Sequence, residues 1–328
     1  MSEGLTIMAT ILVTGGCGFI GSHLCVALLA RGDRVRVLDD LSTGSESNLA
    51  PGASLMIGDV ARPDTVRQAM VGVDAVFHLA AVASVERGVQ DPYGTHCVNL
   101  SATVAVLDAA RHQGAPVVYA SSAAVYGDAT DLPLADTTAT RPLSAYGADK
   151  LGCEQHARVA GHTHGVRTAG LRFFNVYGPR QDPRSPYSGV ISIFCDRLAA
   201  GREVVVFGDG GQTRDFVYVG DVVRRLLAAL PAASTAAPVF NVCTGQPTSV
   251  LQLAQTIAAL CGQDARIRYD TPRAGEIRDS LGRPSPIAGL AEAPPVTLRD
   301  GLAETLAWLA AGRPGLSQKA SPVPAFSA

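Results

Sequence analysis

Short apolar runs alternate with helix-like segments from Thr10 to about Leu171. Each run is too short for a helix and is followed by turn residues, a pattern typical of strands buried on both faces of a parallel sheet. The predicted strands are Ile11–Val13, Val35–Leu38, Ser54–Ile57, Val73–Leu79, Val117–Tyr119 and Arg167–Leu171. The segments between them, 18–31, 63–71, 94–113 and 145–164, are predicted crossover helices. This alternation predicts an α/β fold with a doubly wound parallel sheet.

The sequence changes character after Arg172. Segments rich in Pro and Gly alternate with predicted helices near 190–200, 221–230, 249–261 and 299–310. This part predicts a second, smaller lobe of mixed α/β structure at the C-terminal side. Residues 312–328 are rich in Pro, Ser and Ala, a composition that predicts a disordered tail.

Charge and composition exclude several classes of partner. The formal net charge is −2, so the chain lacks the basic field of a nucleic-acid-binding protein. No apolar stretch approaches the roughly 18 residues that span a bilayer, and the first residues do not form a secretory signal, so we expect no membrane partner. The seven cysteines are scattered without C-x-x-C pairing. They predict neither disulfides nor a metal site, and they favour a reducing, cytoplasmic location.

A glycine-rich loop follows the first predicted strand directly. Gly15, Gly18 and Gly21 are spaced as G-x-x-G-x-x-G and open the first predicted helix. Glycine permits a tight turn and lets backbone amides approach a pyrophosphate, which the helix N-terminus also attracts. The spacing alone is weak, but a strand before the loop and a helix after it favour a dinucleotide site.

Acidic residues follow the second and third predicted strands. Asp39 lies 18 residues beyond Gly21, where a carboxylate can accept both adenosine ribose hydroxyls and would repel a 2′-phosphate. This position favours NAD over NADP, with Asp40 as the adjacent alternative. Asp59 and Val60 follow the third strand and are placed to bracket an adenine, although an acid there can also cap a helix.

Tyr146 and Lys150 are four residues apart in a predicted helix, so both side chains project from one face. Only two of the 27 basic residues are lysines, and the other, Lys319, falls in the predicted tail. A lysine kept in a chain dominated by arginine indicates a need for a compact ammonium. A phenol loses its proton in water only at about pH 10, and a neighbouring cation favours the phenolate. The pair therefore predicts a tyrosine that acts as general base and acid.

Ser122 lies in S-S-A-A-V-Y-G, at the carboxyl end of the fifth predicted strand, where open α/β sheets bind their ligands. A serine after a strand is often only a turn residue. Together with Tyr146 and Lys150, Ser122 is predicted to hydrogen-bond the substrate oxygen whose proton Tyr146 transfers.

These motifs together resemble the extended short-chain dehydrogenase/reductase superfamily and, within it, the nucleotide-sugar epimerases of the UDP-galactose and UDP-N-acetylglucosamine 4-epimerase type. The resemblance covers residues 9 to about 310. It is carried by T-G-G-C-G-F-I-G at 14–21, H-L-A-A at 78–81, Asn99, S-S-A-A-V-Y-G at 121–127, Y-G-A-D-K at 146–150 and R-F-F-N-V-Y-G-P-R at 172–180.

The resemblance implies a Rossmann domain over 9–171, which also receives 215–245, and a substrate lobe over 172–214 and 246–311. It implies NAD as cofactor, a UDP-sugar as substrate and a homodimer formed through a helix bundle. The implied catalytic residues are Ser122, Tyr146 and Lys150. The implied cofactor-binding residues are Gly15, Gly18, Phe19, Ile20, Gly21, Asp39, Asp59, Val60, Leu79, Ala80, Ala81, Asn99, Tyr146 and Lys150. The implied substrate-binding residues are Ser84, Ser122, Tyr146, Asn175, Arg214, Arg273 and Ser280.

The expected reaction is 4-epimerisation of a UDP-hexose through a transient 4-keto intermediate. Dehydratases of the superfamily usually place Asp-Glu where this chain has Ala123 and Ala124, which disfavours 4,6-dehydration and, less strongly, decarboxylation of UDP-glucuronate. A UDP-glucuronate 4-epimerase stays an alternative. An NAD-binding regulator without catalysis is another, disfavoured because the three catalytic positions are intact.

The expected sugar follows from the same resemblance. Ser280 aligns with a position at the end of the hexose pocket, where a small residue leaves room for an N-acetyl group. Ser84-Val85 and the turn at 180–183 resemble the branch that accepts N-acetylhexosamines. We therefore expect interconversion of UDP-GlcNAc and UDP-GalNAc, together with that of UDP-Glc and UDP-Gal.

Overall fold

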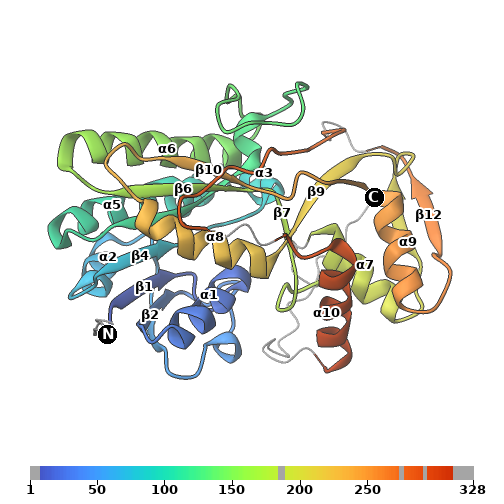
Figure 1. Cartoon of the computed structure of the whole chain (residues 1–328), viewed down its shortest axis with the longest axis horizontal. Helices are drawn as coiled ribbons and strands as arrows, with labels where there is room; N and C mark the ends of the chain where they lie inside the picture. The colour runs from blue at the N-terminus through green and yellow to red at the C-terminus, as the bar shows by residue number, and fades with distance from the viewer. Residues whose placement is uncertain (1–7, 184–188, 273–276, 291–293, 313–328) are drawn as a thin grey trace.

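A seven-stranded parallel sheet forms the centre of the larger lobe (Figure 1). The computed structural model describes residues 8–183, 189–272, 277–290 and 294–312. Along the sheet the strand order is β10-β6-β5-β4-β1-β2-β3. These strands are β1 (Thr10–Thr14), β2 (Arg34–Asp39), β3 (Ser54–Ile57), β4 (Ala75–His78), β5 (Val117–Ser122), β6 (Thr168–Phe173) and β10 (Val239–Val242). The order reverses at β1, so the crevice where a ligand is expected lies between the carboxyl ends of β1 and β4. The predicted doubly wound fold is confirmed.

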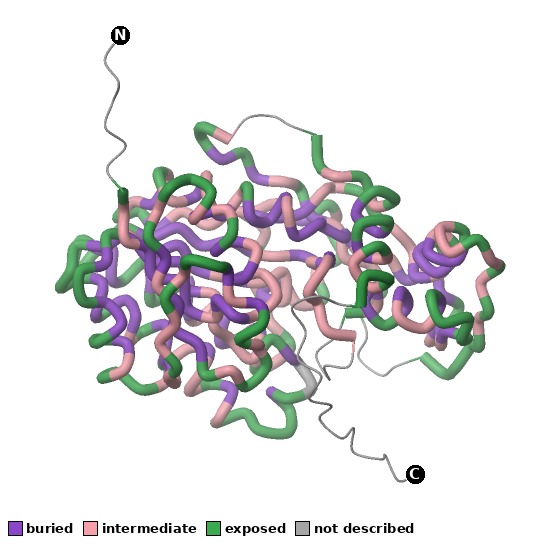
Figure 2. The backbone as a smooth tube through the Cα atoms, turned by 90° about the horizontal axis from the view of Figure 1, so that it is seen from below, coloured by how far each residue is buried: buried purple, intermediate pink, exposed green. Residues whose placement is uncertain are grey.

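Helices cover both faces of this sheet (Figure 1). On one face, α1 (Phe19–Ala30) and α8 (Val219–Ala232) pack on Ile11 and Val13. On the other face, α2 (Pro63–Met70), α5 (Ala102–Gln113) and α6 (Ala145–His164) pack on Leu12. Successive side chains of a strand point to opposite faces, so a continuous apolar strand is buried by both helix layers. Figure 2 shows the buried residues gathered along the middle of this lobe.

β10 comes from far along the chain. It pairs in parallel with β6, with Val239 opposite Gly170 and Val242 opposite Phe173. Because α8 precedes β10 and packs beside α1, the chain returns to the larger lobe after crossing into the smaller one. The chain therefore crosses between the two lobes several times, and these crossings hold the lobes together where they meet.

The smaller lobe lies at the right of Figure 1. A three-stranded sheet has the order β11-β9-β7, and β12 pairs with β8 in a two-stranded sheet. The strands are β7 (Asn175–Tyr177), β8 (Val204–Phe207), β9 (Thr213–Tyr218), β11 (Pro247–Ser249) and β12 (Ile267–Asp270). The helices α7 (Val190–Ala199), α9 (Val250–Leu260) and α10 (Leu298–Ala310) cover them and share one apolar core.

The predicted helix over 94–113 is wrong as a single element. The chain forms α3 (Val85–Gln90), then α4 (Pro92–His96), a π-helical turn over Cys97–Ser101, and α5. The Asp91 side chain caps α4 by accepting from the amide of Gly94. Single π-helical turns are rare and frequently occur at functional sites.

Short 3-10 turns complete the described elements at Glu46–Asn48 and Ala123–Tyr126. In the part of the chain that the structure describes, every helix is too short or too polar to span a bilayer. The predicted disordered tail lies outside the described residues, apart from Gly312.

Candidate active site

The glycine loop joins β1 to α1 at the carboxyl edge of the sheet. Gly15 has a left-handed φ of +72°, and a Cβ there would lie 2.8 Å from the Ala80 amide nitrogen. A Cβ on Gly21 would lie 2.1 Å from the Gly15 carbonyl oxygen. Side chains at either position would close the loop, so the bare backbone is required for its shape.

α1 begins at Phe19, with Gly18 as its N-cap and without a side-chain cap. The first amides of a helix lack partners within the helix and carry its positive dipole end. Phe19 and Ile20 therefore present backbone amides at the loop rather than side-chain chemistry. Such a cradle fits the pyrophosphate of a dinucleotide.

Asp39 ends β2 beside this loop. Its Oδ2 accepts from the Cys17 amide at 2.9 Å and its Oδ1 from the Leu41 amide at 2.9 Å. Burial raises the pKa of the Asp39 carboxyl, and the two amide hydrogen bonds oppose that rise. Each oxygen can still accept a further hydrogen bond, as a ribose diol requires. The neighbouring Asp40 is exposed and bonds Ser42 instead.

The loops after β3 and β4 flank the crevice. The Asp59 Oδ1 accepts from the Ala61 amide at 2.8 Å, and Val60 is buried behind it. Asp59 does not cap α2, whose N-cap is Arg62. Leu79 and Ala80 both donate backbone amides to the Thr14 Oγ1, which holds the segment of Leu79, Ala80 and Ala81 against the glycine loop.

Asn99 and His78 hydrogen-bond other parts of the protein, and the sequence alone does not predict these bonds. Asn99 is fully buried, and its amide accepts from the Val82 nitrogen at 2.9 Å and donates to the Val82 oxygen at 3.1 Å. His78 bonds Thr14 at 2.7 Å and Thr103 at 3.1 Å. Burial, reinforced by the Lys150 charge, lowers the pKa of His78 to about 3, so its ring is neutral.

Tyr146 and Lys150 project from the first turns of α6. The Lys150 Nζ lies 5.9 Å from the centroid of the Tyr146 ring and donates to the Ala120 carbonyl oxygen at 3.0 Å. Lys150 is 4% exposed, so its charge acts in a poorly hydrated environment. Tyr146 is only partly buried and thus open to a ligand.

Ser122 ends β5 beside the start of α6. Its Oγ accepts from the Ala124 amide at 3.1 Å, which leaves the hydroxyl proton available for donation. A Cβ on Gly147 would lie 2.6 Å from the Ala124 carbonyl oxygen, so α6 approaches this turn closely. The structure thus brings Ser122 and Tyr146 to the same edge of the sheet.

Besides Ser122 and Tyr146, four predicted substrate residues lie on the smaller lobe and on the loop after β4. Asn175 pairs with Phe216, and Arg214 is two residues before Phe216, so register places Asn175 and Arg214 on one face of the β11-β9-β7 sheet. The Ser280 amide donates to the Thr213 carbonyl at 3.1 Å, which puts Ser280 beside Arg214. Ser84 is buried and caps α3.

Two further arginines differ in what the structure says of them. Arg273 lies outside the described residues. Arg278 makes a two-point contact with Asp209, with Nη1–Oδ1 and Nη2–Oδ2 distances of 2.8 and 3.0 Å. This guanidinium lowers the pKa of Asp209 to about 2.

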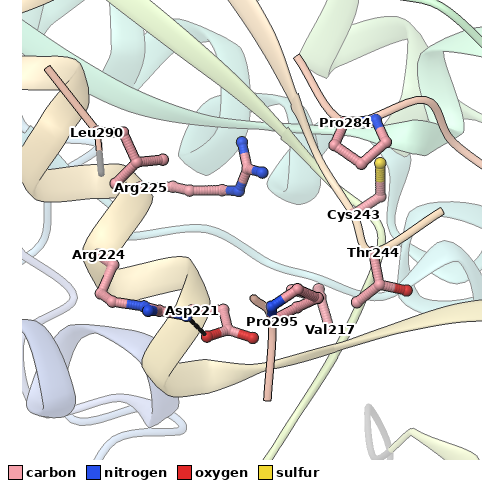
Figure 3. Close-up of a pocket in the computed structure, with 9 residues that line it drawn as sticks. All are labelled: Val217, Asp221, Arg224, Arg225, Cys243, Thr244, Pro284, Leu290 and Pro295. Atoms are coloured by element: carbon pink, nitrogen blue, oxygen red, sulfur yellow. Dashed lines mark hydrogen bonds and ion pairs between the residues drawn. The ribbon is translucent and has the colours of Figure 1, made fainter. Parts of the chain in front are cut away.

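A cavity of about 190 Å³ lies between α8, the end of β10 and the segment around Pro284 (Figure 3). Asp221 and Arg224 form an ion pair at its wall, while Arg225 and Cys243 face it from either side. None of the predicted site residues lines it. The residues that the structure describes also contain no cluster of three His, Cys, Asp or Glu side chains suited to a metal ion.

Comparison with known proteins identifies the family. Residues 11–243 match the model of the NAD dependent epimerase/dehydratase family. A UDP-glucose 4-epimerase of Mycolicibacterium smegmatis is 38% identical over 90% of this chain and 96% of its own length. A dTDP-glucose 4,6-dehydratase of an Actinoplanes species is 36% identical over 92% of this chain and 98% of its own length. The structure of a UDP-N-acetylglucosamine 4-epimerase from Methanobrevibacter ruminantium superposes with a TM-score of 0.88, at 32% identity, over 93% of this chain and 99% of that one.

The chain therefore belongs to the NAD-dependent epimerase/dehydratase family of the extended short-chain dehydrogenase/reductases, and it is an NAD-dependent enzyme. The cradle of Gly15, Gly18 and Gly21 and the acceptor pair of Asp39 fit this cofactor.

Proposed function

We propose that the enzyme epimerises C4 of a UDP-hexose. The arrangement of Tyr146, Lys150 and Ser122 at the crevice carries this proposal, because it supplies one proton-transfer group, its counter-charge and one hydrogen-bond donor. Residues 172–214 and 246–311 would supply the nucleotide and sugar contacts, with Asn175, Arg214 and Ser280 on one side of the crevice. A guanidinium such as that of Arg214 suits the oxygens of a pyrophosphate.

In this mechanism Tyr146 removes the proton from O4 of the hexose, and Ser122 hydrogen-bonds the same oxygen. Bound NAD supplies the chemistry of accepting the hydride of C4 and giving it back. Lys150 stabilises the phenolate that accepts this proton, and Tyr146 holds the proton as a neutral phenol while the 4-keto sugar turns in the pocket. Tyr146 then returns the proton, and the product differs from the substrate only at C4.

The main competing reactions are 4,6-dehydration and decarboxylation, and relatives of this chain are named for each of them. Dehydration needs an additional acid and base close to C5 and C6. The turn after Ser122 carries Ala123 and Ala124, at the positions where dehydratases of the superfamily usually have Asp-Glu. Methyl groups cannot move protons, so the described residues favour epimerisation. A UDP-glucuronate 4-epimerase would need the same catalytic trio and would differ only in its sugar. An NAD-binding regulator without catalysis would not need the trio.

The decisive variant is Tyr146→Phe, which removes the phenolic hydroxyl and keeps the ring. We expect the variant to fold and retain NAD, and its epimerisation rate to fall about 10²–10⁴-fold, the usual contribution of general acid–base catalysis. Sugar-nucleotide chromatography at substrate saturation measures the rate. A near-wild-type rate would remove Tyr146 from the mechanism.

For the sugar, we propose UDP-GlcNAc and UDP-GalNAc, with UDP-Glc and UDP-Gal as further substrates. The small Ser280 next to Arg214 supports room for an N-acetyl group. Ser280→Tyr should fill that space and lower kcat/KM for UDP-GlcNAc about tenfold more than for UDP-Gal, because a clash discriminates against the larger substrate. Equal losses for both sugars would contradict the assignment of Ser280.

We also propose a homodimer and a cytoplasmic location. Val89, Tyr93, Val104 and Val159 expose apolar side chains on the neighbouring helices α3 to α6, which supports a helix-bundle interface. All seven cysteines are free, as expected in a reducing compartment.

A further inference from the structure

We propose that the buried pair of Glu154 and Arg172 positions the catalytic trio and holds it in register with the segment that carries Ser280. The proposal rests on the proposed catalytic roles of Ser122, Tyr146 and Lys150. Glu154 and Arg172 are positioning residues, since neither side chain reaches the crevice: their side chains are 5% and 7% exposed.

The pair ties α6 to β5 and β6. Arg172 donates from Nε to the Glu154 Oε1 at 2.8 Å and from Nη2 to Oε2 at 2.7 Å, a two-point fork that fixes both distance and orientation. Ser121 donates its hydroxyl to the same Oε1 at 2.6 Å. Glu154 lies one helical turn after Lys150, and Ser121 precedes Ser122. Ser122 is thus next to a residue that bonds Glu154, and Lys150 is one helical turn from Glu154 itself.

Further hydrogen bonds lead from Arg172 toward the segment that carries Ser280. The Arg172 Nη1 donates to the Tyr126 hydroxyl oxygen at 2.8 Å, and that hydroxyl donates to the Asn241 Oδ1 at 2.6 Å. Asn241 in turn donates from Nδ2 to the Leu134 carbonyl at 2.9 Å. The Leu134 amide donates to the carbonyl of Leu281, the residue after Ser280.

A second anchor holds the same segment from the other side. Asp215 is fully buried on β9, and its carboxylate accepts from the Thr244, Gly245 and Gly282 amides. Two of these amides lie between β10 and β11, and the third lies two residues after Ser280. The Ser280 segment is therefore clamped between Asp215 and the chain of bonds that begins at Glu154.

Stability alone does not explain a buried ion pair. Replacing one by apolar residues of similar volume is often neutral or stabilising. A directional fork does something that apolar packing cannot, because it fixes one geometry of α6 relative to β5. A displacement of about 1 Å at reacting groups can cost about 100-fold in rate, so this geometry matters at Tyr146.

The test compares Glu154→Gln and Arg172→Lys with the wild type. Gln keeps the shape of Glu but points an amide NH₂ at the Arg172 Nη2, and Lys keeps the charge of Arg but cannot span both oxygens. We expect kcat to fall about tenfold or more in both variants, with KM for the UDP-sugar within about twofold and bound NAD unchanged. Asp221→Asn is the matched control, since it breaks another ion pair of a buried carboxylate away from β5. It should lower Tm without lowering kcat.

A second readout does not depend on turnover. In protein labelled with ¹³C at Cζ of tyrosine, the Tyr146 NMR signal, assigned with Tyr146→Phe, should move in Glu154→Gln and Arg172→Lys but not in Asp221→Asn. Wild-type kcat and an unmoved Tyr146 signal in folded Glu154→Gln would overturn the positioning role. A moved signal in a protein that epimerises no UDP-sugar would support the positioning role and contradict the proposed function instead.

Discussion

Lys150 is held by one carbonyl and faces one aromatic ring. Its ammonium donates to the Ala120 oxygen at 3.0 Å and lies 5.9 Å from the centre of the Tyr146 ring. An ammonium has three donors, so two stay available for ribose or phenolate oxygens. A guanidinium is larger and planar and could not occupy this small space in the same way. That difference explains why position 150 is a lysine in a chain whose other basic residues, apart from Lys319, are arginines.

His78 makes stability depend on pH. Its ring is neutral in the folded enzyme because burial lowers its pKa from 6.5 to about 3, while the unfolded chain takes up a proton near 6.5. Below pH 6.5 the unfolded state therefore binds more protons, and stability is lost as the pH falls toward 3. For one such group the loss is up to about 1.4 kcal/mol per pH unit.

Chemical denaturation of wild type and His78→Gln at several pH values between 6.5 and 4.5 isolates this effect. The free energy of unfolding of the wild type should fall more steeply than that of His78→Gln, even though the variant loses the bonds to Thr14 and Thr103. His112→Gln is the control, because His112 is exposed. Parallel slopes for wild type and His78→Gln would show that His78 is not buried in its neutral form.

At the scale of elements, the β1–α1 turn combines a fold requirement with a binding requirement. We expect Gly21→Ala to abolish NAD retention, because its methyl group would meet the Gly15 carbonyl at 2.1 Å and push the cradle open. Overpacking of this kind costs about 1–3 kcal/mol of stability. Release and enzymatic assay of NAD from purified protein measure retention.

Gly114→Ala is the matched glycine variant. Gly114 ends α5 with φ +67° and has open space around it. Forcing alanine into this conformation costs about 1–2 kcal/mol. Gly114→Ala should thus lose similar stability and keep its NAD. Full NAD occupancy in Gly21→Ala would refute the cradle.

Sequence patterns predicted strands β1 to β6 of the larger lobe because these strands are continuous apolar runs between helices with helical periodicity. They missed β10 and predicted one helix over 94–113, where the chain forms several helical elements. They predicted Tyr146 and Lys150 because one helical turn relates the two residues. They did not reveal the strands of the smaller lobe, which are as short as Pro247–Ser249, where apolar alternation cannot develop.

Hydrogen bonds between residues far apart in the chain could not be predicted from the sequence either. The cofactor role that the resemblance implies for Asn99 stays a prediction. The hydrogen bonds of its amide to the Val82 backbone come from a π-helical turn, which has no simple periodicity in the sequence. The Glu154–Arg172 fork joins residues 18 positions apart on different elements. Only the packing of α6 on β5 and β6 creates it. A Glu four residues after Lys150 was the single hint in the sequence.

At the scale of the whole molecule, the exposed apolar side chains of α3 to α6 predict an assembly. Sedimentation velocity should show one species of twice the 33.9 kDa chain mass. Val159, 57% exposed on α6, offers a direct test. Val159→Asp should shift the enzyme toward the monomer, because a carboxylate placed in an apolar interface loses its hydration. A monomeric wild type at micromolar concentration would contradict the homodimer.

In the proposed mechanism, the cofactor cradle and Tyr146 act on one side of the crevice, and Asn175, Arg214 and Ser280 bind the substrate on the other. Such an arrangement would let the nucleotide stay fixed while the sugar turns. An epimerase regenerates its NAD in every cycle, so the enzyme should work without added cofactor.

The most direct test is the product formed from UDP-GlcNAc, or from UDP-Gal, by the purified enzyme with only its bound NAD, read by ¹H NMR. We predict the C4 epimer of the supplied sugar, reached as the same equilibrium mixture from either epimer, with no net change in NAD. A 4-keto-6-deoxy sugar would instead reveal a dehydratase. No product from a panel of UDP-hexoses despite full NAD occupancy would contradict the account and favour a silent NAD-binding protein.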